Sequence, residues 1–137
     1  MTRAICLAIA LAFIPACATT GERLPLRPLP GDEGAALPYA ELLTRARVQA
    51  TAATEAFYVN KWTDLEEAAK GLEQTARFLG KAADVPANQK DKLPVVAGDL
   101  AKDAVKLREA AKAQDVEKVQ EIQQRVHLKV RELRLDG

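Results

Sequence analysis

Apolar residues recur with helical spacing along the chain from residue 38 onward. The first repeat alternates steps of four and three residues, at Tyr39, Leu43, Ala46, Ala50, Ala53 and Phe57. This spacing is typical of a helix that packs one narrow stripe against neighbouring helices. Three later stretches carry a comparable stripe, so we expect four helices, each about 30 Å long for about 20 residues.

Three local signals predict where these helices begin and end. Thr63, followed by Glu66, matches a capping box, in which the threonine side chain satisfies the first backbone N–H groups of a helix. Pro86 disfavours helical geometry at the preceding residue, so the second helix should end near Asp84. Residues 86–92 are expected to form a loop, and Asp115 to cap the last helix. The predicted buried positions of the last three helices are Leu65, Ala68, Leu72, Thr75 or Ala76, and Leu79; Ala97, Leu100, Ala104, Leu107 and Ala111; and Val116, Val119, Ile122, Val126, Val130 and Leu133.

Two of the three connections between these helices are short, which forces neighbouring helices to run in opposite directions. We therefore predict an all-α fold, an antiparallel up-down-up-down four-helix bundle that occupies residues 38–137. A domain of about 100 residues can bury a sufficient core without disulfides or metals.

The N-terminus predicts export and lipidation. Arg3 precedes an uncharged stretch that ends at Ala16 and is too short to span a bilayer, which needs roughly 20 apolar residues. This is the layout of a secretory signal. Ile14-Pro15-Ala16-Cys17 resembles the bacterial lipobox, which implies that residues 1–16 are removed and that Cys17 carries the lipid. An ordinary secretory signal, cut nearby, is the alternative.

Residues 17–37 are expected to form a tether between the lipid and the bundle. Pro25, Pro28 and Pro30 favour an extended polyproline conformation, which spans about 3.1 Å per residue. A PxxP ligand motif is the alternative interpretation of this stretch. The residue after Cys17 is Ala18, not the Asp that resembles an inner-membrane retention signal. We therefore expect the protein on the periplasmic face of the envelope, at the outer membrane rather than the inner one.

Composition removes several classes of function. Cys6 leaves with the signal and Cys17 is acylated, so no thiol is left for a disulfide, a zinc cluster or a nucleophile. The chain has no serine, and its 20 Lys+Arg nearly balance 19 Asp+Glu. Without a basic face there is no case for nucleic-acid binding. We expect a protein that is not an enzyme.

His127 is the one residue that suggests a cofactor. It is the only histidine, and Gln124 stands three residues before it, so the paired Glu-x-x-His motif of a di-iron centre is missing. The sequence from Gln123 to Arg131 resembles the last helix of the four-helix cytochromes, the cytochrome c-prime family and its b-type relative, which carries His-x-x-aromatic-Arg. His127 and Arg131 reproduce that spacing, with Val130 in the aromatic position.

The resemblance implies a helical bundle in which His127 is an axial ligand of haem iron and Arg131 lies beside it. The cysteines of the family's haem-attachment motif fall on Gln123 and Val126, so a covalently held haem is excluded. The b-type relative adds a methionine ligand, but Met1 is the only methionine and leaves with the signal. The helical period places His127 about 100° from the core position Val126, at the partly exposed edge of the core.

Two functions follow from these observations. The favoured one is a non-catalytic envelope lipoprotein without a cofactor, whose bundle has a structural role or binds an envelope protein partner. The alternative is a b-type haem protein that uses His127 as the axial ligand. Two further features bear on the choice. Phe57, Tyr58 and Trp62 are expected to plug one end of the bundle, or else to form a ligand platform. The small alanines of the stripes allow close packing, or leave room for a flat ligand.

Overall fold

A computed structural model describes residues 28–31 and 36–134. Cys17, the predicted signal at 1–16 and most of the predicted tether lie outside these residues. The described part is all-helical, as predicted, and its only bridge between extended segments joins Pro38 to Ala83. Its helices are α1 (Tyr39–Tyr58), α2 (Trp62–Leu79), α3 (Ala87–Lys90), α4 (Leu93–Lys112) and α5 (Val116–Glu132).

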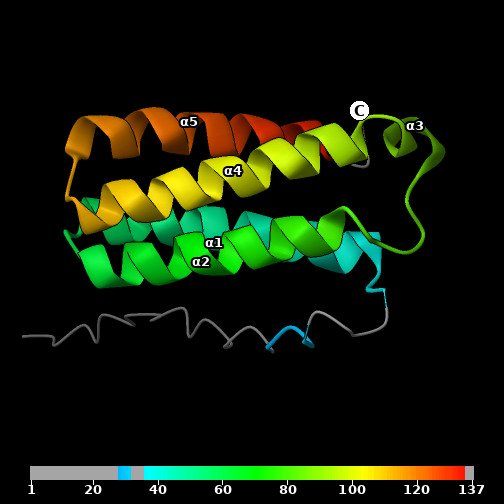
Figure 1. Cartoon of the computed structure of the whole chain (residues 1–137), viewed down its shortest axis with the longest axis horizontal. Coiled ribbons are helices and arrows are strands. Elements are labelled where there is room, and N and C mark those ends of the chain that lie inside the picture. Colours follow the sequence, from blue (N-terminus) through cyan, green and yellow to red (C-terminus); the bar gives the residue numbers. More distant parts are fainter. Residues whose placement is uncertain (1–27, 32–35, 135–137) are drawn as a thin grey trace, which may run out of the picture.

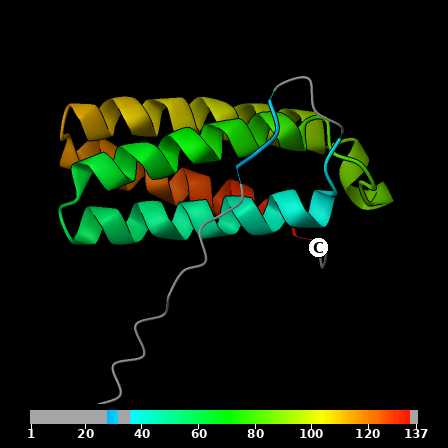
Figure 2. The same cartoon turned by 90° about the horizontal axis from the view of Figure 1, so that it is seen from below.

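The four long helices lie side by side (Figure 1, Figure 2). Helix α1 packs against α2 and α5, and α4 packs against the same two helices from the other side. Helix α3 is a single turn that contacts α4. Among the helices that the structure describes, none has both the length and the apolar character needed to cross a membrane.

The two predicted caps have different outcomes. The Asp115 carboxylate accepts a hydrogen bond from the backbone N–H of Lys118 at 3.1 Å, which confirms it as the cap of α5. The capping box at Thr63 is wrong, because α2 begins at Trp62 and no side chain caps it. Asn60 adopts a left-handed φ of 55°, which turns the chain back into a helix before Thr63 is reached.

The end of α2 also differs from the prediction. The helix stops at Leu79 and not near Asp84. The following residues pair with the segment before α1: the Tyr39 N–H donates to the Ala83 carbonyl at 3.0 Å, and the Ala83 N–H donates to the Leu37 carbonyl at 2.9 Å. These bonds hold the backbone extended, and α2 cannot continue through it. The predicted loop that follows is partly helical, because it contains α3.

Helix α3 and Tyr39 complete the C-terminal end of α5. The Gln89 side-chain amide, which is almost fully buried, donates to the carbonyls of Glu132 at 3.2 Å and Arg134 at 3.0 Å. The buried Tyr39 hydroxyl donates to the Leu133 carbonyl. The last carbonyls of a helix have no partner within the helix. Side chains from two other parts of the chain therefore satisfy them here.

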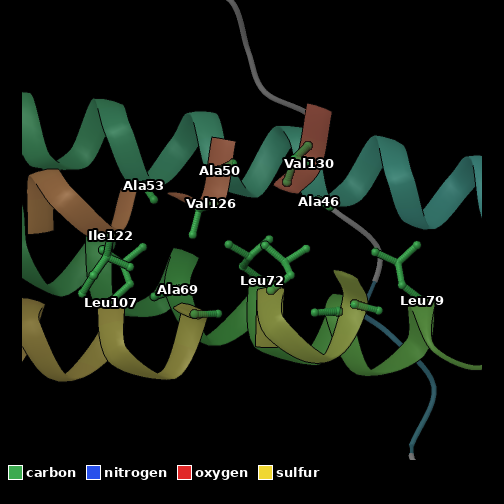
Figure 3. Packing of buried hydrophobic residues seen from close by; sticks show 14 of the residues in the cluster. Ala46, Ala50, Ala53, Ala69, Leu72, Leu79, Leu107, Ile122, Val126 and Val130 are labelled. Atoms are coloured by element: carbon green, nitrogen blue, oxygen red, sulfur yellow. The ribbon is translucent and has the colours of Figure 1, made fainter. Parts of the chain in front are cut away.

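The core consists of leucines, alanines and a few β-branched residues contributed by all four long helices (Figure 3). Most predicted stripe positions are buried. Phe57 and Ala68 are only half-buried and Val116 is exposed, whereas Ala56 and Ala69 take buried places that the stripes did not include. An α-helix has 3.6 residues per turn, so a stripe that repeats every 3.5 residues drifts around the helix surface. The buried positions therefore depart from the predicted stripe.

Buried charges join α4 to α5. The Asp103 carboxylate, 6% exposed, lies 3.3 Å from Arg125 Nε and 3.2 Å from Lys129 Nζ, and both cations come from α5. Removing one member of such a group is strongly destabilising, since it leaves a buried charge without compensation. These contacts therefore fix the register of α5 against α4 more than they add net stability.

Candidate functional site

A hollow in the described part of the chain lies between α1 and α5. We call it the α1/α5 groove, and its volume is about 790 Å³. A smaller hollow of about 260 Å³ continues it and shares three of its residues, His127, Arg131 and Arg134. The residues of the larger hollow are Thr54, Phe57, Tyr58, Gln120, Gln123, Gln124, His127, Leu128, Arg131 and Arg134. Arg47, Ala50, Thr51 and Val130 complete the smaller one.

The groove arises from the kind of side chains that α1 and α5 place between them. Helix α1 contributes the buried alanines Ala46, Ala50 and Ala53, and α5 contributes Val126 and Val130 (Figure 3). Such small side chains fill the seam but do not extend beyond it. The flanks of the seam are lined by longer polar side chains, and the space between these flanks remains open.

A buried polar contact joins α1 and α5 at the groove. The Gln123 side-chain amide, which is buried, donates a hydrogen bond of 3.2 Å to the Ala53 carbonyl across the α1–α5 boundary. The bond satisfies a polar group that would otherwise be costly to bury. Gln123 therefore ties α5 to α1 within the lining of the groove.

His127 lies exposed in the wall of the groove, and a hydrogen bond restrains its ring. The His127 Nε2 is 2.9 Å from the Thr54 hydroxyl, which also donates to the Ala50 carbonyl at 3.1 Å. A hydroxyl has one proton to donate. Since Thr54 gives this proton to Ala50, the bond to His127 is best assigned with Nε2–H as donor. Nδ1 takes no part in this bond.

Three arginines surround the basic end of the groove. Arg131 lies one helical turn beyond His127, Arg134 lies almost one further turn along, and Arg47 faces them from α1. Within the described residues, none of the three guanidinium groups forms an ion pair with a carboxylate. A guanidinium offers five N–H donors in a planar fork that matches carboxylate and phosphate oxygens. The basic end is therefore a set of unused anion-binding groups.

The opposite end of the groove is aromatic. Phe57 is half-buried and contacts Tyr58 and Trp62 in edge-to-face geometry, with ring centroids 5.8 and 5.9 Å apart. Tyr58 is 77% exposed and lines the groove. The expected plug at the end of the bundle therefore does not include Tyr58, whose ring is available to a ligand. Leu128, 51% exposed, adds an apolar surface from α5 between this end and Arg131.

The groove offers little to a metal ion by itself. No group of three His, Cys, Asp or Glu side chains in the ranges 28–31 and 36–134 is placed to hold one. A haem could use His127 as a single nitrogen ligand, but ligation through Nε2 would require the hydrogen bond to Thr54 to break. The residues present thus fit a haem only in part, because the one nitrogen ligand, His127 Nε2, is already hydrogen-bonded to Thr54.

The sequence singled out His127 and Arg131, and the structure places both in one groove. Arg134 could have joined them, because residues seven apart lie on the same face of a helix. Arg47 and Thr54 could not, because only the register between α1 and α5 brings them to the same place. Cys17 lies outside the described residues.

No family model, curated protein or solved structure matches the chain. The groove is therefore interpreted from its own geometry and chemistry.

Proposed function

We propose that the chain is an envelope lipoprotein, held by a lipid on Cys17 at the periplasmic face of the outer membrane, that binds a ligand or an envelope protein partner without catalysing a reaction or holding a resident cofactor. The α1/α5 groove is its binding surface. The proposal combines the lipobox resemblance at residues 14–17 with the groove, and the groove is the observation that carries the binding role.

In this proposal, α1, α2, α4 and α5 form an antiparallel up-down-up-down four-helix bundle. Two contacts between α1 and α5 support opposite directions: Tyr39 bonds to the carbonyl of Leu133, and Gln123 bonds to the carbonyl of Ala53. The earlier residue of α1, Tyr39, pairs with the later residue, Leu133, at the end of α5. The later residue of α1, Ala53, pairs with the earlier residue, Gln123. Turns of about three residues join α1 to α2 and α4 to α5, and short connections favour antiparallel neighbours.

A binding role suits the groove better than a catalytic one. Its volume is within the range of small-molecule sites, and apolar, amide and basic groups converge on it. A hydroxyl nucleophile needs a base that takes its proton. Thr54 instead gives its proton to the Ala50 carbonyl, and His127 lies beside it as a donor. The hydrogen bond between Thr54 and His127 thus restrains the His127 ring and does not activate a nucleophile.

The lipid anchor is tested by comparing the full chain with its Cys17→Ala variant in a bacterial host. We expect the unaltered protein in the membrane fraction and the variant in the soluble periplasmic fraction. Intact-mass measurement of the purified protein should show a chain that begins at residue 17 and carries a diacylglyceryl group with a further acyl chain. An unmodified thiol at Cys17 would reject the lipoprotein assignment.

The binding role is tested with a photo-crosslinking amino acid placed at Leu128 in the wall of the groove. The matched control position is Val95, which is 66% exposed on α4 and lies outside the groove. In intact cells, we expect a discrete adduct from position 128 and none from position 95. Equal labelling from both positions would contradict a specific binding groove between α1 and α5, and labelling from neither would contradict a protein partner at this groove.

A b-type haem protein is the second candidate, and one observation favours it: His127 and Arg131 line the same groove. Titration of the purified protein with hemin, followed at the Soret band, decides between the two. If haem binds through Nε2, Thr54→Val should tighten binding, because it removes the hydroxyl that engages this nitrogen. A Soret change that survives His127→Ala, or no change at all, rejects the haem candidate.

A further inference from the structure

The geometry points to one class of ligand for the α1/α5 groove: a small organic anion with a flat apolar body. Its acidic group lies against Arg131 and Arg134, and its apolar body lies against Phe57 and Tyr58. This inference rests on the proposed binding role and deepens it, because it states what the groove selects. It requires no metal ion and no bond to His127.

The charges that line the groove differ from those that line a neighbouring hollow. A second hollow of about 470 Å³, between α4 and α5, is lined by both signs of charge. There Lys118 pairs with Asp115 at 2.8 Å, and Arg125 pairs with Glu121. The α1/α5 groove has arginines and no acidic residue in its lining. In a protein with nearly equal numbers of acidic and basic residues, this local imbalance attracts an anion.

The opposite end of the groove carries aromatic side chains. Tyr58 on α1 is a large side chain exposed to solvent in the groove lining, and Leu128 on α5 exposes a further apolar side chain between this end and Arg131. The half-buried Phe57 holds the Tyr58 ring by an edge-to-face contact. An apolar ligand surface placed there would remove these groups from water, which favours binding. A purely inorganic anion would leave this end unused.

The distance between the two ends of the groove limits the size of the ligand. Gln124 lies at the aromatic end and Arg131 at the basic end, seven residues apart on α5. A helix rises 1.5 Å per residue, so the two positions are about 10 Å apart along the axis. A body of two fused rings that carries one acidic group spans this distance. The Gln124 amide can also pair with a polar substituent on the body.

The acidic group can be a phosphate or a carboxylate, since both match the guanidinium fork. The test uses 1-naphthyl phosphate as the probe, because it joins a flat two-ring body to a dianion. Two fragments divide the probe: 1-naphthol has the body without the charge, and inorganic phosphate has the charge without the body. Benzoate and 1-naphthoate then show whether a carboxylate replaces the phosphate.

Binding is measured on the purified full chain in a neutral maltoside detergent, with empty micelles as the blank, by following assigned backbone amides in ¹H–¹⁵N spectra. We expect 1-naphthyl phosphate to shift amides at both ends of the groove, around Phe57 and around Arg131. Phosphate alone should shift the basic end, and 1-naphthol the aromatic end. The probe should bind at least tenfold more tightly than either fragment.

Two double variants with the same loss of charge complete the test. Arg131→Gln with Arg134→Gln should weaken probe binding at least tenfold. Lys70→Gln with Lys81→Gln, which removes two exposed charges outside the groove lining, should change it less than twofold. Both variants keep helix-forming side chains, and circular dichroism verifies that each is folded at the temperature of the titration.

The results separate the ligand class from the binding role. If 1-naphthol binds as tightly as the phosphate probe, or if the arginine variant binds unchanged, the anion inference is overturned and the groove is an apolar binding surface. If no probe shifts the groove amides, the inference also fails. The crosslinking at position 128 then decides by itself whether the groove binds a macromolecular partner.

Discussion

The packing between α2 and α4 differs in kind from the packing between α1 and α5. Leucines occupy the first region, and Leu72, Leu79, Leu100 and Leu107 are all fully buried. The second region has alanines on α1 and valines on α5 (Figure 3). Hydrogen bonds at Ala53, Thr54 and Leu133 join its two helices. One helix pair therefore supplies apolar burial, and the other supplies an accessible surface.

The free energies of apolar burial and of hydrogen bonding explain why one molecule contains both kinds of packing. Complete burial of a leucine side chain stabilises a fold by about 1.5–3 kcal/mol, whereas a typical hydrogen bond contributes about 0.5–1.5 kcal/mol net. The α2/α4 region can hold the domain together. The α1/α5 region can then keep small seam residues and polar flanks, because stability does not depend on filling it.

The largest effect is expected from Leu107→Ala in the α2/α4 region. Leu107 is fully buried, and truncation of such a leucine leaves a cavity that costs about 2–5 kcal/mol. Chemical denaturation followed by circular dichroism measures this loss. A change below about 1 kcal/mol would show that the leucine region is not the principal source of stability.

Ala50→Leu tests the α1/α5 seam by adding side-chain volume, whereas Leu107→Ala removes it. Ala50 is 2% exposed between the two helices and lines the smaller hollow. Extra methylenes in a packed seam cost about 1–3 kcal/mol, so we expect a smaller loss of stability than for Leu107→Ala. Weaker binding of 1-naphthyl phosphate should accompany it. An unchanged free energy of unfolding would mean that the seam is loose enough to accept a larger side chain.

Tyr39→Phe removes the hydrogen bond from α1 to the C-terminal end of α5. The Leu133 carbonyl then lacks its partner in a buried place, and the expected loss is about 1–2 kcal/mol. The same denaturation series measures it. Tyr58→Phe is the matched control, because Tyr58 is exposed, and it should leave stability nearly unchanged.

Tyr39 also predicts a dependence on alkaline pH. Burial raises the pKa of the Tyr39 phenol above its ordinary value of 10.0, and Arg47 opposes part of this rise. In the unfolded chain the phenol therefore ionises first. Its contribution to stability is complete below about pH 10 and is lost as pH rises through the folded-state pKa. Tyr39→Phe should lack this alkaline component, and an identical pH profile would contradict the assignment.

Thr54→Val should change stability by less than about 1 kcal/mol, because the hydroxyl bonds at a partly exposed position. The variant also tests the orientation of the His127 ring, which loses its hydrogen bond to Thr54. Nitrogen-15 spectra of the imidazole should show Nε2–H as the major neutral tautomer in the unaltered protein and a mixture in the variant. The same mixture in both would show that Thr54 does not orient the ring.

The smallest effect is expected from Asp115→Ala at the turn before α5. The hydrogen bonds and charge of Lys118 lower the pKa of the Asp115 carboxyl below its ordinary value of 3.8. Its contribution to stability is therefore present above that value and is lost as pH falls through the folded-state pKa. The melting temperature of the variant should be slightly lower at neutral pH and equal to that of the unaltered protein in strong acid.

Local chemistry was sufficient to predict the number of long helices and the cap at Asp115. The prediction was wrong where a distant segment intervenes. Helix α2 ends early because Ala83 pairs with the residues before α1, and α3 forms where Gln89 reaches the end of α5. Neither contact leaves a periodic signal, because the partners are about 45 residues apart in the chain.

The sequence by itself determined the all-helical character, because helix periodicity and helix-forming composition depend on neighbours within a few turns. It also singled out His127 and Arg131, which share one helical face. Only the tertiary structure decided that Arg47, Thr54 and Tyr58 join them. That outcome depends on the register of α1 against α5, which is set by the bonds at Ala53 and Leu133. These bonds join residues that lie far apart in the sequence, and local periodicity does not encode them.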